Sequence, residues 1–426
     1  MLLKHNRRWV VFMWLFLIGV LAYMDRTNFA ISVKPIMKEF GIDAAQMGLI
    51  MSAFAIGYTL LNFPGGFFAQ KFGGRLSLTL IVLFWSIMTI ATGFAWSFAS
   101  LIVIRVLFGM GEGPHLPANA RITDRWVRPQ ERGLASAIWC SALPLGIIVG
   151  QILCAWIATA WGWRATFTSL GFAGIIVAAF TWVVVRDTPK EHTWVCEEEL
   201  KLIEESQALT AKEQAKSEMT FNQIISNPWH WVITIIMFCI GASFWANISW
   251  LPTYFIQARG FNLQNAGFVA SVPWVLCIVS PFVVGWVSDR IGKNKRTITL
   301  MMWLAIQVPF IAYGVYTPNI KWCLVSFCIS LFFVWGAATL MWTIPFDVFS
   351  RTDGTKISGM MLTGGSIGGI FAPTMVGYML KWTGSFDMVY YCLAGIEFFA
   401  FLLAIALFFK EKSVHRALDS KTSVTP

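Results

Sequence analysis

The loop Gly66–Arg75 reads Gly-Phe-Phe-Ala-Gln-Lys-Phe-Gly-Gly-Arg, and a related loop, Gly285–Lys293, reads Gly-Trp-Val-Ser-Asp-Arg-Ile-Gly-Lys. Each loop stands between two apolar runs, and we call the shift from position 66 to position 285 the repeat offset. Glycines permit a tight turn, and the cations can meet carbonyls at a helix end. The repeat offset aligns further glycines: Gly41 with Gly260, Gly48 with Gly267, Gly146 with Gly365, and Gly150 with Gly369. Because repeated matches at one offset indicate an internal repeat, the chain is expected to consist of two halves of one design.

The composition places the chain in a membrane. Of its 426 residues, 57% are hydrophobic and 13% are charged, whereas soluble domains carry about 25% charged residues. This composition excludes a cytosolic enzyme. Twelve apolar runs have about the length that a helix needs to cross a bilayer. They are residues 9–33, 47–70, 76–96, 98–121, 133–160, 164–186, 229–256, 265–288, 297–316, 320–346, 357–381 and 386–410.

The predicted fold class is an all-α integral membrane protein, with twelve transmembrane helices in two pseudo-symmetric six-helix bundles. The predicted parts are an N-terminal six-helix bundle (1–186), a cytoplasmic linker (187–228), a C-terminal six-helix bundle (229–410) and a cytoplasmic tail (411–426). Two like bundles typically hold a ligand near the bilayer midplane. The pairs Gly146/Gly150 and Gly365/Gly369 are small-xxx-small seams, at which helices approach closely.

The basic residues predict the orientation. With both termini on one side, that side holds 24 of the 32 Lys and Arg residues, the other side holds six, and Arg26 and Arg105 fall within spans. By the positive-inside rule, both termini are cytoplasmic. The net charge of +10 is therefore a sign of topology, and no nucleic-acid partner is expected.

Neither a metal nor another cofactor is expected. The eight cysteines form no C-x-x-C pair and are interpreted as small apolar packing residues. The spans contain no metal-ligand cluster, and Ser141 has no His close in the sequence that would activate it as a nucleophile. An enzyme is therefore not expected.

Four ionisable residues fall inside the first six spans: Asp25, Arg26, Arg105 and Glu112. An ionisable group at the centre of a span costs about 2.5–3.5 kcal/mol, so each requires a partner or a function. Asp25 and Arg26 are adjacent on one helix and point about 100° apart, whereas Arg105 and Glu112 share one face of another helix. These positions predict crossed pairs, with Asp25 facing Arg105 and Glu112 facing Arg26.

Two interpretations of these pairs stay open. In the first, they only hold the first helix to the fourth. In the second, an anionic substrate takes Arg26, and Glu112 then binds a proton because its counter-charge is gone. Two such acids can carry two protons, and a monovalent anion entering with two protons gains about 2.3 kcal/mol per 100 mV. His115, one turn after Glu112, either tunes its proton affinity or packs. Glu397, a single acid in the last span, either faces a polar neighbour, reaches towards the membrane surface or has a functional role.

The repeated loop resembles the signature of the major facilitator superfamily, in which it occurs twice. In the first copy, Gln70 stands where the signature has an acid, which puts a gating pair centred on an acid there in doubt. The predicted gating motif consists of Gly66, Lys71, Gly73, Arg75, Asp289, Arg290 and Gly292.

Three further stretches resemble one branch of the superfamily, the anion:cation symporters of the galactonate, glucarate and galactarate type. They are Tyr23–Asn28 (Tyr-Met-Asp-Arg-Thr-Asn), the run from Arg105 through Gly-Met-Gly-Glu-Gly-Pro to Pro117-Ala-Asn-Ala-Arg121, and Trp250–Tyr254 (Trp-Leu-Pro-Thr-Tyr). The resemblance implies proton-driven uptake of a small organic anion across a bacterial inner membrane. It implies that Arg26 binds the substrate carboxylate, that Tyr58 lines the pocket, and that Asp25 and Glu112 are the proton-coupling sites.

Further residues are expected to contact the substrate or to assist coupling. The expected substrate contacts are Tyr23, Ser141, Asn247, Trp250, Tyr254, Thr363 and Ser366, and the expected charge-pair and coupling residues are Arg105 and His115. The expected partners are a small organic anion, protons and the lipid bilayer, and the chain is expected to be a monomer.

The departures from the sugar-acid carriers fall in the expected pocket. Where those carriers have Asn-Ser-Ala-Gln, this chain has Cys-Ser-Ala-Leu at 140–143, and two typical asparagines are replaced by Leu362 and Ser366. Leucine cannot bind hydroxyls, and unpaired polar groups cost about 1–3 kcal/mol each. The predicted substrate is therefore a sugar acid or, better suited to these residues, a less hydroxylated or aromatic carboxylate. Four tryptophans serve either as its apolar walls or as packing residues: Trp245, Trp250, Trp274 and Trp342.

Two alternatives to symport are considered. An anion exchanger or facilitator of the same fold would have acids that do not titrate during turnover. A membrane anion sensor would bind without transport and would signal through the linker (187–228) or the tail.

Overall fold

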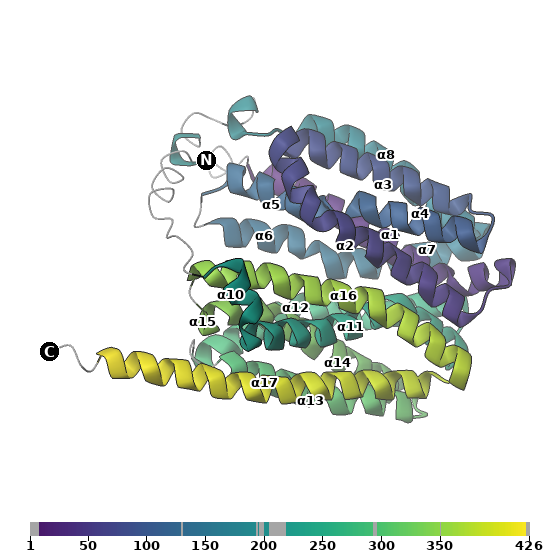
Figure 1. The fold of residues 1–426 in the computed structure, drawn as a ribbon. Coiled ribbons are helices and arrows are strands. Elements are labelled where there is room, and N and C mark those ends of the chain that lie inside the picture. Colours follow the sequence, from purple (N-terminus) through teal and green to yellow (C-terminus); the bar gives the residue numbers. More distant parts are fainter. Residues whose placement is uncertain are drawn as a thin grey trace. The chain divides into compact units, whose positions relative to one another are not determined.

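The computed structural model describes residues 8–128, 131–192, 195, 200–203, 219–292, 296–349 and 351–422, and the regular structure within these ranges is helical (Figure 1). The helices of the first half are α1 (Trp9–Phe40), α2 (Ala44–Phe72), α3 (Gly74–Gly93), α4 (Phe98–Glu112), α5 (His115–Trp126), α6 (Arg132–Cys140), α7 (Ala142–Trp161) and α8 (Trp163–Val184). A 3₁₀ turn follows at Pro189–Glu191.

The helices of the second half are α10 (Phe221–Ser226), α11 (Pro228–Gln257), α12 (Leu263–Ile291), α13 (Arg296–Tyr316), α14 (Ile320–Met341), α15 (Ile344–Val348), α16 (Arg351–Thr383) and α17 (Phe386–Thr422). Every run predicted to span the membrane coincides with one or two of these helices. In the fourth run Gly113 and Pro114 separate α4 from α5, and in the fifth Ser141 lies between α6 and α7.

Ten helices in the described ranges are long and apolar enough to cross a membrane. The other two predicted spans are 98–121, which is interrupted before Pro114, and 357–381, which lies in the Gly-, Ser- and Thr-rich helix α16. Small and hydroxylated residues lower the hydropathy of a helix but let it pack closely against a neighbour. The chain is an all-helical, multi-pass membrane protein.

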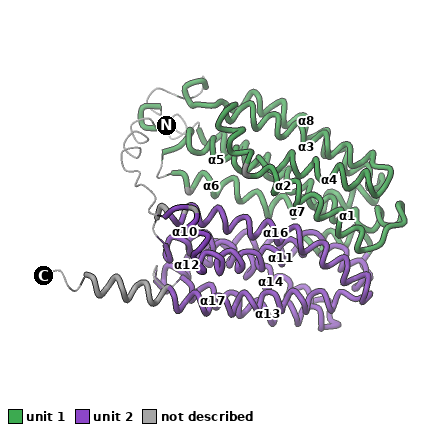
Figure 2. Tube along the Cα trace, viewed as in Figure 1, with its two compact units in different colours: residues 1–214, 262–271 green, residues 215–261, 272–426 purple. Residues whose placement is uncertain are grey.

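The chain forms two compact units, coloured separately in Figure 2. Unit 1 comprises residues 1–214 and 262–271, and unit 2 comprises residues 215–261 and 272–426. The predicted boundaries at 186 and 228 lie on either side of the division at 214, and much of the predicted linker lies outside the described residues.

Glycine seams join corresponding helices within each unit. In unit 1, α7 packs on α1 so closely that a Cβ at Gly150 would lie 2.8 Å from Cα of Met24. In unit 2, α16 packs on α11, and a Cβ at Gly241 would lie 2.6 Å from the carbonyl oxygen of Gly365. The repeat offset aligns Met24 of α1 with Ser243 of α11, and Gly150 of α7 with Gly369 of α16. The helices that pack together in unit 1 therefore correspond to those that pack together in unit 2.

Candidate functional site

Unit 1 holds the four residues that we call the charged cluster: Asp25 and Arg26 on α1, and Arg105 and Glu112 on α4. Helix α2 completes their surroundings, because Gly109 on α4 lies directly against the backbone of α2. This close approach brings the α2 aromatic rings beside the cluster. The site therefore requires glycine at position 109, because a Cβ there would push α4 away from α2.

Arg26 and Glu112 form a buried ion pair. The Nε and Nη2 atoms of Arg26 lie 2.8 Å and 2.6 Å from the same carboxylate oxygen, Oε1 of Glu112. The other oxygen, Oε2, is buried and has no hydrogen-bond partner within the described ranges. The Glu112 side chain is fully buried, whereas that of Arg26 keeps 8% of its surface exposed. The predicted proximity of these two residues is confirmed, and their roles stay predictions.

Aromatic rings surround the Arg26 guanidinium. Its central carbon lies 4.6 Å from the ring centre of Tyr23, 4.9 Å from that of Tyr58 and 5.3 Å from that of Phe54. Cations are attracted to the faces of such rings within about 6 Å. Tyr23 and Tyr58, both predicted to contact the substrate, thus hold the cation in place without neutralising its charge. An anion approaching Arg26 would meet these rings as its walls.

The predicted facing of Asp25 and Arg105 is met only in part: among the described residues the two charged groups lie near enough to interact electrostatically, but they form no direct ion pair. Across the described ranges, no ion pair joins them and neither Asp25 oxygen accepts a hydrogen bond. Thr89 lies beside Asp25 but donates its hydroxyl to the Trp85 carbonyl, at 3.0 Å. The physical reason is that a different environment, three phenylalanine rings, holds Arg105.

The rings that hold Arg105 are those of Phe29, Phe54 and Phe108, with centres 4.4, 4.9 and 4.9 Å from the guanidinium carbon. They come from α1, α2 and α4, so Arg105 ties three helices together. Sequence reasoning missed this cage because its aromatic residues are far apart in the chain. The signal available was only the unusual count of 36 phenylalanines.

His115 packs rather than contacting Glu112. The ring is buried, its Nε2 lies 3.1 Å from Nδ2 of Asn119, and it meets Trp85 edge-to-face with ring centres 5.4 Å apart. Asn119 is one turn further along α5, so the amide can donate to the ring nitrogen. Of the two interpretations of His115, the geometry matches packing.

The other predicted substrate contacts differ in whether their polar groups already have hydrogen-bond partners in the protein. Ser141 is exposed and donates to the Ile138 carbonyl at 2.6 Å, at the junction of α6 and α7. In unit 2, Thr363 and Ser366 donate to carbonyls one turn earlier in α16. Asn247 is buried and donates to the Ser243 carbonyl at 2.8 Å, which leaves its Oδ1 without a partner in the described ranges.

Trp250 and Tyr254 are buried in the packing of unit 2. Trp250 Nε1 donates to the Pro373 carbonyl at 3.3 Å. The Tyr254 hydroxyl accepts from Arg259 Nε at 2.8 Å, and its ring packs against Phe327 and Tyr390. Their polar atoms already have protein partners, so their predicted contact with substrate gains no support from this geometry.

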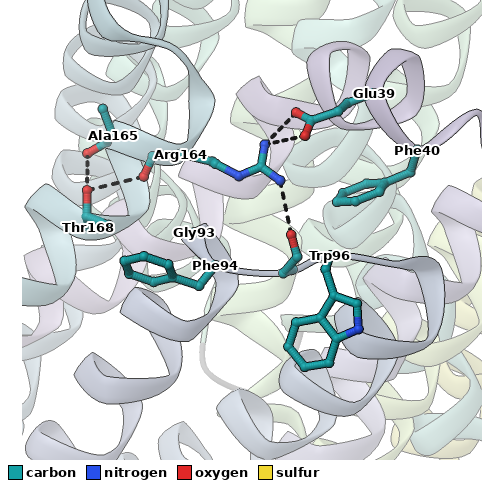
Figure 3. A pocket seen from close by; sticks show the side chains of 9 residues that line it. Glu39, Phe40, Gly93, Phe94, Trp96, Arg164, Ala165 and Thr168 are labelled. Carbon is teal, nitrogen blue, oxygen red and sulfur yellow. Dashed lines mark hydrogen bonds and ion pairs between the residues drawn. The ribbon is translucent and has the colours of Figure 1, made fainter.

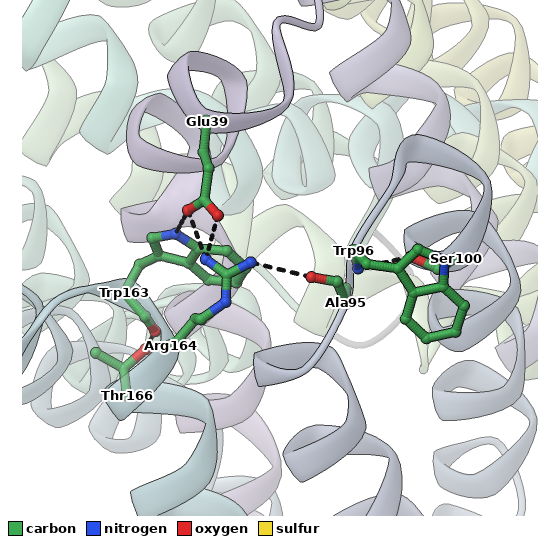
Figure 4. Close-up of polar contacts among 7 residues, drawn as sticks. All are labelled: Glu39, Ala95, Trp96, Ser100, Trp163, Arg164 and Thr166. Carbon is green, nitrogen blue, oxygen red and sulfur yellow. Dashed lines mark hydrogen bonds and ion pairs between the residues drawn. The ribbon is translucent and has the colours of Figure 1, made fainter.

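A hollow of about 600 Å³ lies where α3 ends and α8 begins (Figure 3). It contains Arg164, whose guanidinium pairs with Glu39 at 2.5 Å and donates to the Ala95 carbonyl at 3.0 Å (Figure 4). Trp163 donates to the same carboxylate at 2.8 Å. Because the Arg164 and Glu39 side chains are 40% and 44% exposed, solvent weakens the attraction of this cation for an anion, and the hollow is a poorer anion site than the buried charged cluster.

The sequence model of the Major Facilitator Superfamily matches residues 15–373. The chain belongs to this superfamily. Members are transporters, and this chain is a multi-pass transporter and not an enzyme.

Curated relatives cover nearly the whole chain. The probable sulfoacetate transporter SauU of Cupriavidus necator is 32% identical over 86% of this chain and 86% of its own length. The probable galactarate/D-glucarate transporter GudP of Bacillus subtilis is 31% identical over 90% of this chain and 88% of its own. The D-galactonate transporter of Escherichia coli O6:H1 is 28% identical over 89% and 90%.

Solved structures share the fold at lower identity. A bacterial homologue of the human lysosomal transporter Spinster superposes with a TM-score of 0.76, at 19% identity, over 96% of this chain and 97% of that chain. A D-xylose–proton symporter superposes with a TM-score of 0.72, at 13% identity, over 92% and 96%. The major facilitator fold predicted from the sequence is thereby confirmed.

The superfamily's loop signature has an unexpected acid in unit 1. Gly73 has φ +83°, and a Cβ there would collide with the carboxylate of Asp187, which accepts the backbone N–H of Arg75 at 2.8 Å. The Arg75 side chain donates to the Trp182 carbonyl, and its guanidinium lies 3.8 Å from the Trp182 ring centre. Asp187, just after α8, thus provides a carboxylate at the loop where Gln70 replaces the usual acid.

The second copy of the loop in unit 2 keeps the glycine turn. Gly292 has φ +113°, and the Arg290 guanidinium lies 3.9 Å from the Trp286 ring centre. Asp289 and Arg290 are both exposed, and no Cβ collision arises at Gly285. In unit 1, Gly66 is equally open and Lys71 lies 5.3 Å from the Phe72 ring centre. The gating role of both copies stays a prediction.

Within the described ranges, no three His, Cys, Asp or Glu side chains gather as a metal site requires. The acids of the charged cluster instead lie among guanidinium groups and aromatic rings. This arrangement is suited to binding anions and protons.

Proposed function

We propose that the chain is a proton-coupled symporter that imports a small organic anion by alternating access. The observation that carries this proposal is the Arg26–Glu112 pair, in which one buried carboxylate oxygen receives both guanidinium contacts. Arg26 is the partly exposed member and Glu112 the fully buried one. An incoming carboxylate or sulfonate therefore reaches Arg26 first and can replace Glu112 as its partner, since Arg binds such groups with paired donors.

Proton uptake follows from the loss of that partner. A buried charge whose partner is removed costs about 3–5 kcal/mol. Glu112 avoids this cost by binding a proton when the substrate occupies Arg26. Asp25, which has no ion-pair partner in the described part of unit 1, is the second proton site. Substrate and protons thus enter together, because each makes the other's binding favourable.

The charge of the substrate decides which gradient drives transport. A monovalent anion that enters with two protons carries one net positive charge inward and gains about 2.3 kcal/mol per 100 mV of membrane potential. A dianion with two protons is electroneutral and is driven by the pH gradient alone. The response of uptake to an imposed potential therefore reports the net charge moved.

The substrate class is proposed from the pocket departures and the relatives together. The relatives are named for hydroxylated sugar acids and for sulfoacetate, a short acid with no hydroxyl group. In this chain Leu143, beside Ser141, and Leu362 offer no hydrogen bonds to hydroxyls. We infer that the substrate is a carboxylate or sulfonate with few hydroxyls, held by Arg26 and by the Tyr23 and Tyr58 rings.

The proposed setting is a bacterial inner membrane, with both termini in the cytoplasm and the monomer as the transporting unit. The excess of Lys and Arg on one side supports this orientation.

The test is an uptake screen in proteoliposomes with an imposed pH gradient, acidic outside. The panel pairs short carboxylates and sulfonates with sugar acids. We expect accumulation of a weakly hydroxylated acid, with alkalinisation of the outer medium that depends on the substrate. Arg164→Ala is the control, because its cation lies in the separate hollow. Downhill flux and counterflow that persist after the proton gradient is collapsed, with no substrate-driven alkalinisation, would contradict symport and would establish an exchanger or facilitator. Binding without flux would establish a sensor.

A further inference from the structure

A second group of buried polar residues lies in unit 2. It consists of Glu397 on α17, Gln307 on α13 and Ser243 on α11, and all three are fully buried. The Gln307 and Ser243 side chains lie beside the Glu397 carboxyl group. Glu397 therefore does not reach towards the membrane surface but faces the interior of its own bundle.

The polar atoms of these three side chains are not satisfied by hydrogen bonds to the described residues. Five of these atoms lack a hydrogen-bond partner in the described ranges: Oε1 and Oε2 of Glu397, Oε1 and Nε2 of Gln307, and Oγ of Ser243. An unpaired buried polar group is unfavourable because it has lost its hydrogen bonds to water and gained none in the protein. Across those ranges no Lys, Arg or His makes an ion pair with Glu397. The thiol of Cys239, one turn before Ser243 on α11, also lies near Glu397. A bound cation, either a metal ion or a proton, is therefore needed to compensate the charge of the Glu397 carboxylate.

The hydrogen-bonding groups of Gln307 favour a proton over a metal ion at this site. A metal ion would be bound by oxygens and would leave the Nε2–H₂ donors of Gln307 unused, and hard cations take about six oxygen ligands. A proton on Glu397 satisfies both side chains, since the carboxyl O–H donates to Oε1 of Gln307 while Nε2 donates to the other carboxyl oxygen. Ser243 can then donate to either of them. A closed carboxyl–amide pair thus uses four of the five unpaired atoms.

We propose that Glu397 binds a proton in the interior of unit 2 and holds it in a closed pair with Gln307. The site is specific to this half, because the repeat offset places Met24, Met88 and Ala178 at the matching positions of unit 1. Like Asp25 and Glu112 in unit 1, Glu397 is a buried acid that can bind a proton. The site does not depend on the proposed function of unit 1.

The first test compares infrared spectra of the purified protein in lipid with those of Glu397→Gln, without substrate. Gln is a neutral isostere of protonated Glu. The carboxyl groups of unit 1 are present in both proteins, so their bands cancel when the variant spectrum is subtracted from that of the parent. We expect the difference spectrum at neutral pH to contain the C=O band of a protonated carboxyl, which disappears on alkalinisation. Gln307→Leu should shift that band to higher frequency. Carboxylate bands in place of the protonated band would overturn the proposal.

The second test uses the unaltered protein and stays decisive if the variants do not fold. Dicyclohexylcarbodiimide reacts with protonated carboxyls in apolar surroundings, and mass spectrometry locates the adduct. We expect modification of Glu397, declining as pH rises and unchanged by sodium or lithium. Glu131, which is paired with two arginines outside the spans, is the internal control and should stay unmodified. Protection of Glu397 by sodium or lithium would overturn the proposal and establish an alkali-metal site.

Discussion

The corresponding helices α1 of unit 1 and α11 of unit 2 carry opposite chemistry at matching positions. Where α1 has Asp25 and Arg26, α11 has Phe244 and Trp245 at the repeat offset. The α4 residues Arg105 and Glu112 correspond to Leu324 and Leu331. In unit 2, Phe244 packs against aromatic rings instead, with ring centres 5.6 Å from Trp274 and 5.5 Å from Trp335.

The difference shows which features the repeat must keep and which it can change. The glycine seams recur in both units because two helices at close approach leave no room for a Cβ. A buried charge needs partners from several helices at once, so it can be replaced by apolar packing without loss of the bundle. The repeat therefore accounts for the scaffold, and the asymmetry between the units carries the proposed chemistry.

The largest effect is expected from Arg26→Ala set against Trp245→Ala, its counterpart in the repeat. Removing Arg26 leaves Glu112 buried and unpaired at about 3–5 kcal/mol and removes the anion's partner, so substrate affinity should fall by about 100-fold or more. Trp245→Ala should change affinity by less than about 10-fold. Binding is measured by isothermal titration in detergent. Equal losses in the two variants would end the assignment of anion binding to unit 1.

The second-largest effect is a loss of stability expected at the glycine seams, which both units share. Gly150→Leu and Gly369→Leu each insert a side chain where the neighbouring helix already lies within 3 Å of a Cβ, so each should destabilise by about 1–3 kcal/mol. Gly395→Leu is the matched control, because Gly395 is exposed and nothing lies within 4 Å of its Cβ position. Thermal unfolding of the purified variants measures this. A loss in only one unit would show that the seams are not equivalent.

A smaller effect concerns the leucines of the expected pocket, Leu143 and Leu362, which are themselves counterparts at the repeat offset. Leu143→Gln and Leu362→Asn should each improve affinity for hydroxylated acids by about 10-fold, the equivalent of one hydrogen bond to a hydroxyl. Affinity for an acid without hydroxyls should stay level or fall. Competition uptake with a sugar acid and a plain carboxylate measures both values, and unchanged selectivity would remove these leucines from the substrate site.

The smallest effect is expected at the start of α6 in unit 1, where Glu131 contacts Arg8 at 2.8 Å and Arg128 at 2.5 Å. Burial acts to raise the pKa of Glu131, but the hydrogen bond from Arg128 and the charge of Arg8 outweigh it and hold that pKa below its ordinary value. The stabilisation is therefore present above about pH 4.3, the pKa of an unfolded Glu, and is lost as pH falls through the lower folded value.

Arg8→Ala should reduce stability at neutral pH by about 1 kcal/mol or less, and the difference from the parent should vanish in acid. Thermal unfolding across pH measures it, with Glu131→Gln as the comparator that lacks the titrating group. A difference that persists unchanged in acid would show that Arg8 acts through packing alone.

Much of the scaffold could be predicted from the sequence, because long apolar runs and glycines at one offset are local signals. Arg26 and Glu112 could also be paired, since two charges in neighbouring spans have few other partners. The Arg105 cage could not, because its three phenylalanines are common residues on three helices. Asp187 was missed for a similar reason: it meets Gly73 and Arg75 only once α8 has folded back beside α3.

Glu397 shows a further limit of sequence reasoning. Its two neighbours, Gln307 and Ser243, are on helices far from it in the chain, and no spacing rule connects them. From the sequence it could be judged only as a solitary acid in a span. Packing of α11 and α13 against α17 is what gives it polar neighbours.

The exchange of partners at Arg26 is tested most directly with Glu112→Gln in proteoliposomes, by recording counterflow and gradient-driven accumulation of one substrate in the same preparation. If Glu112 binds the proton when the substrate takes Arg26, the variant should retain counterflow, should lose accumulation against a gradient, and should no longer alkalinise the outer medium. If Glu112→Gln still accumulates substrate as the parent does, with the same alkalinisation, the proposed coupling is contradicted.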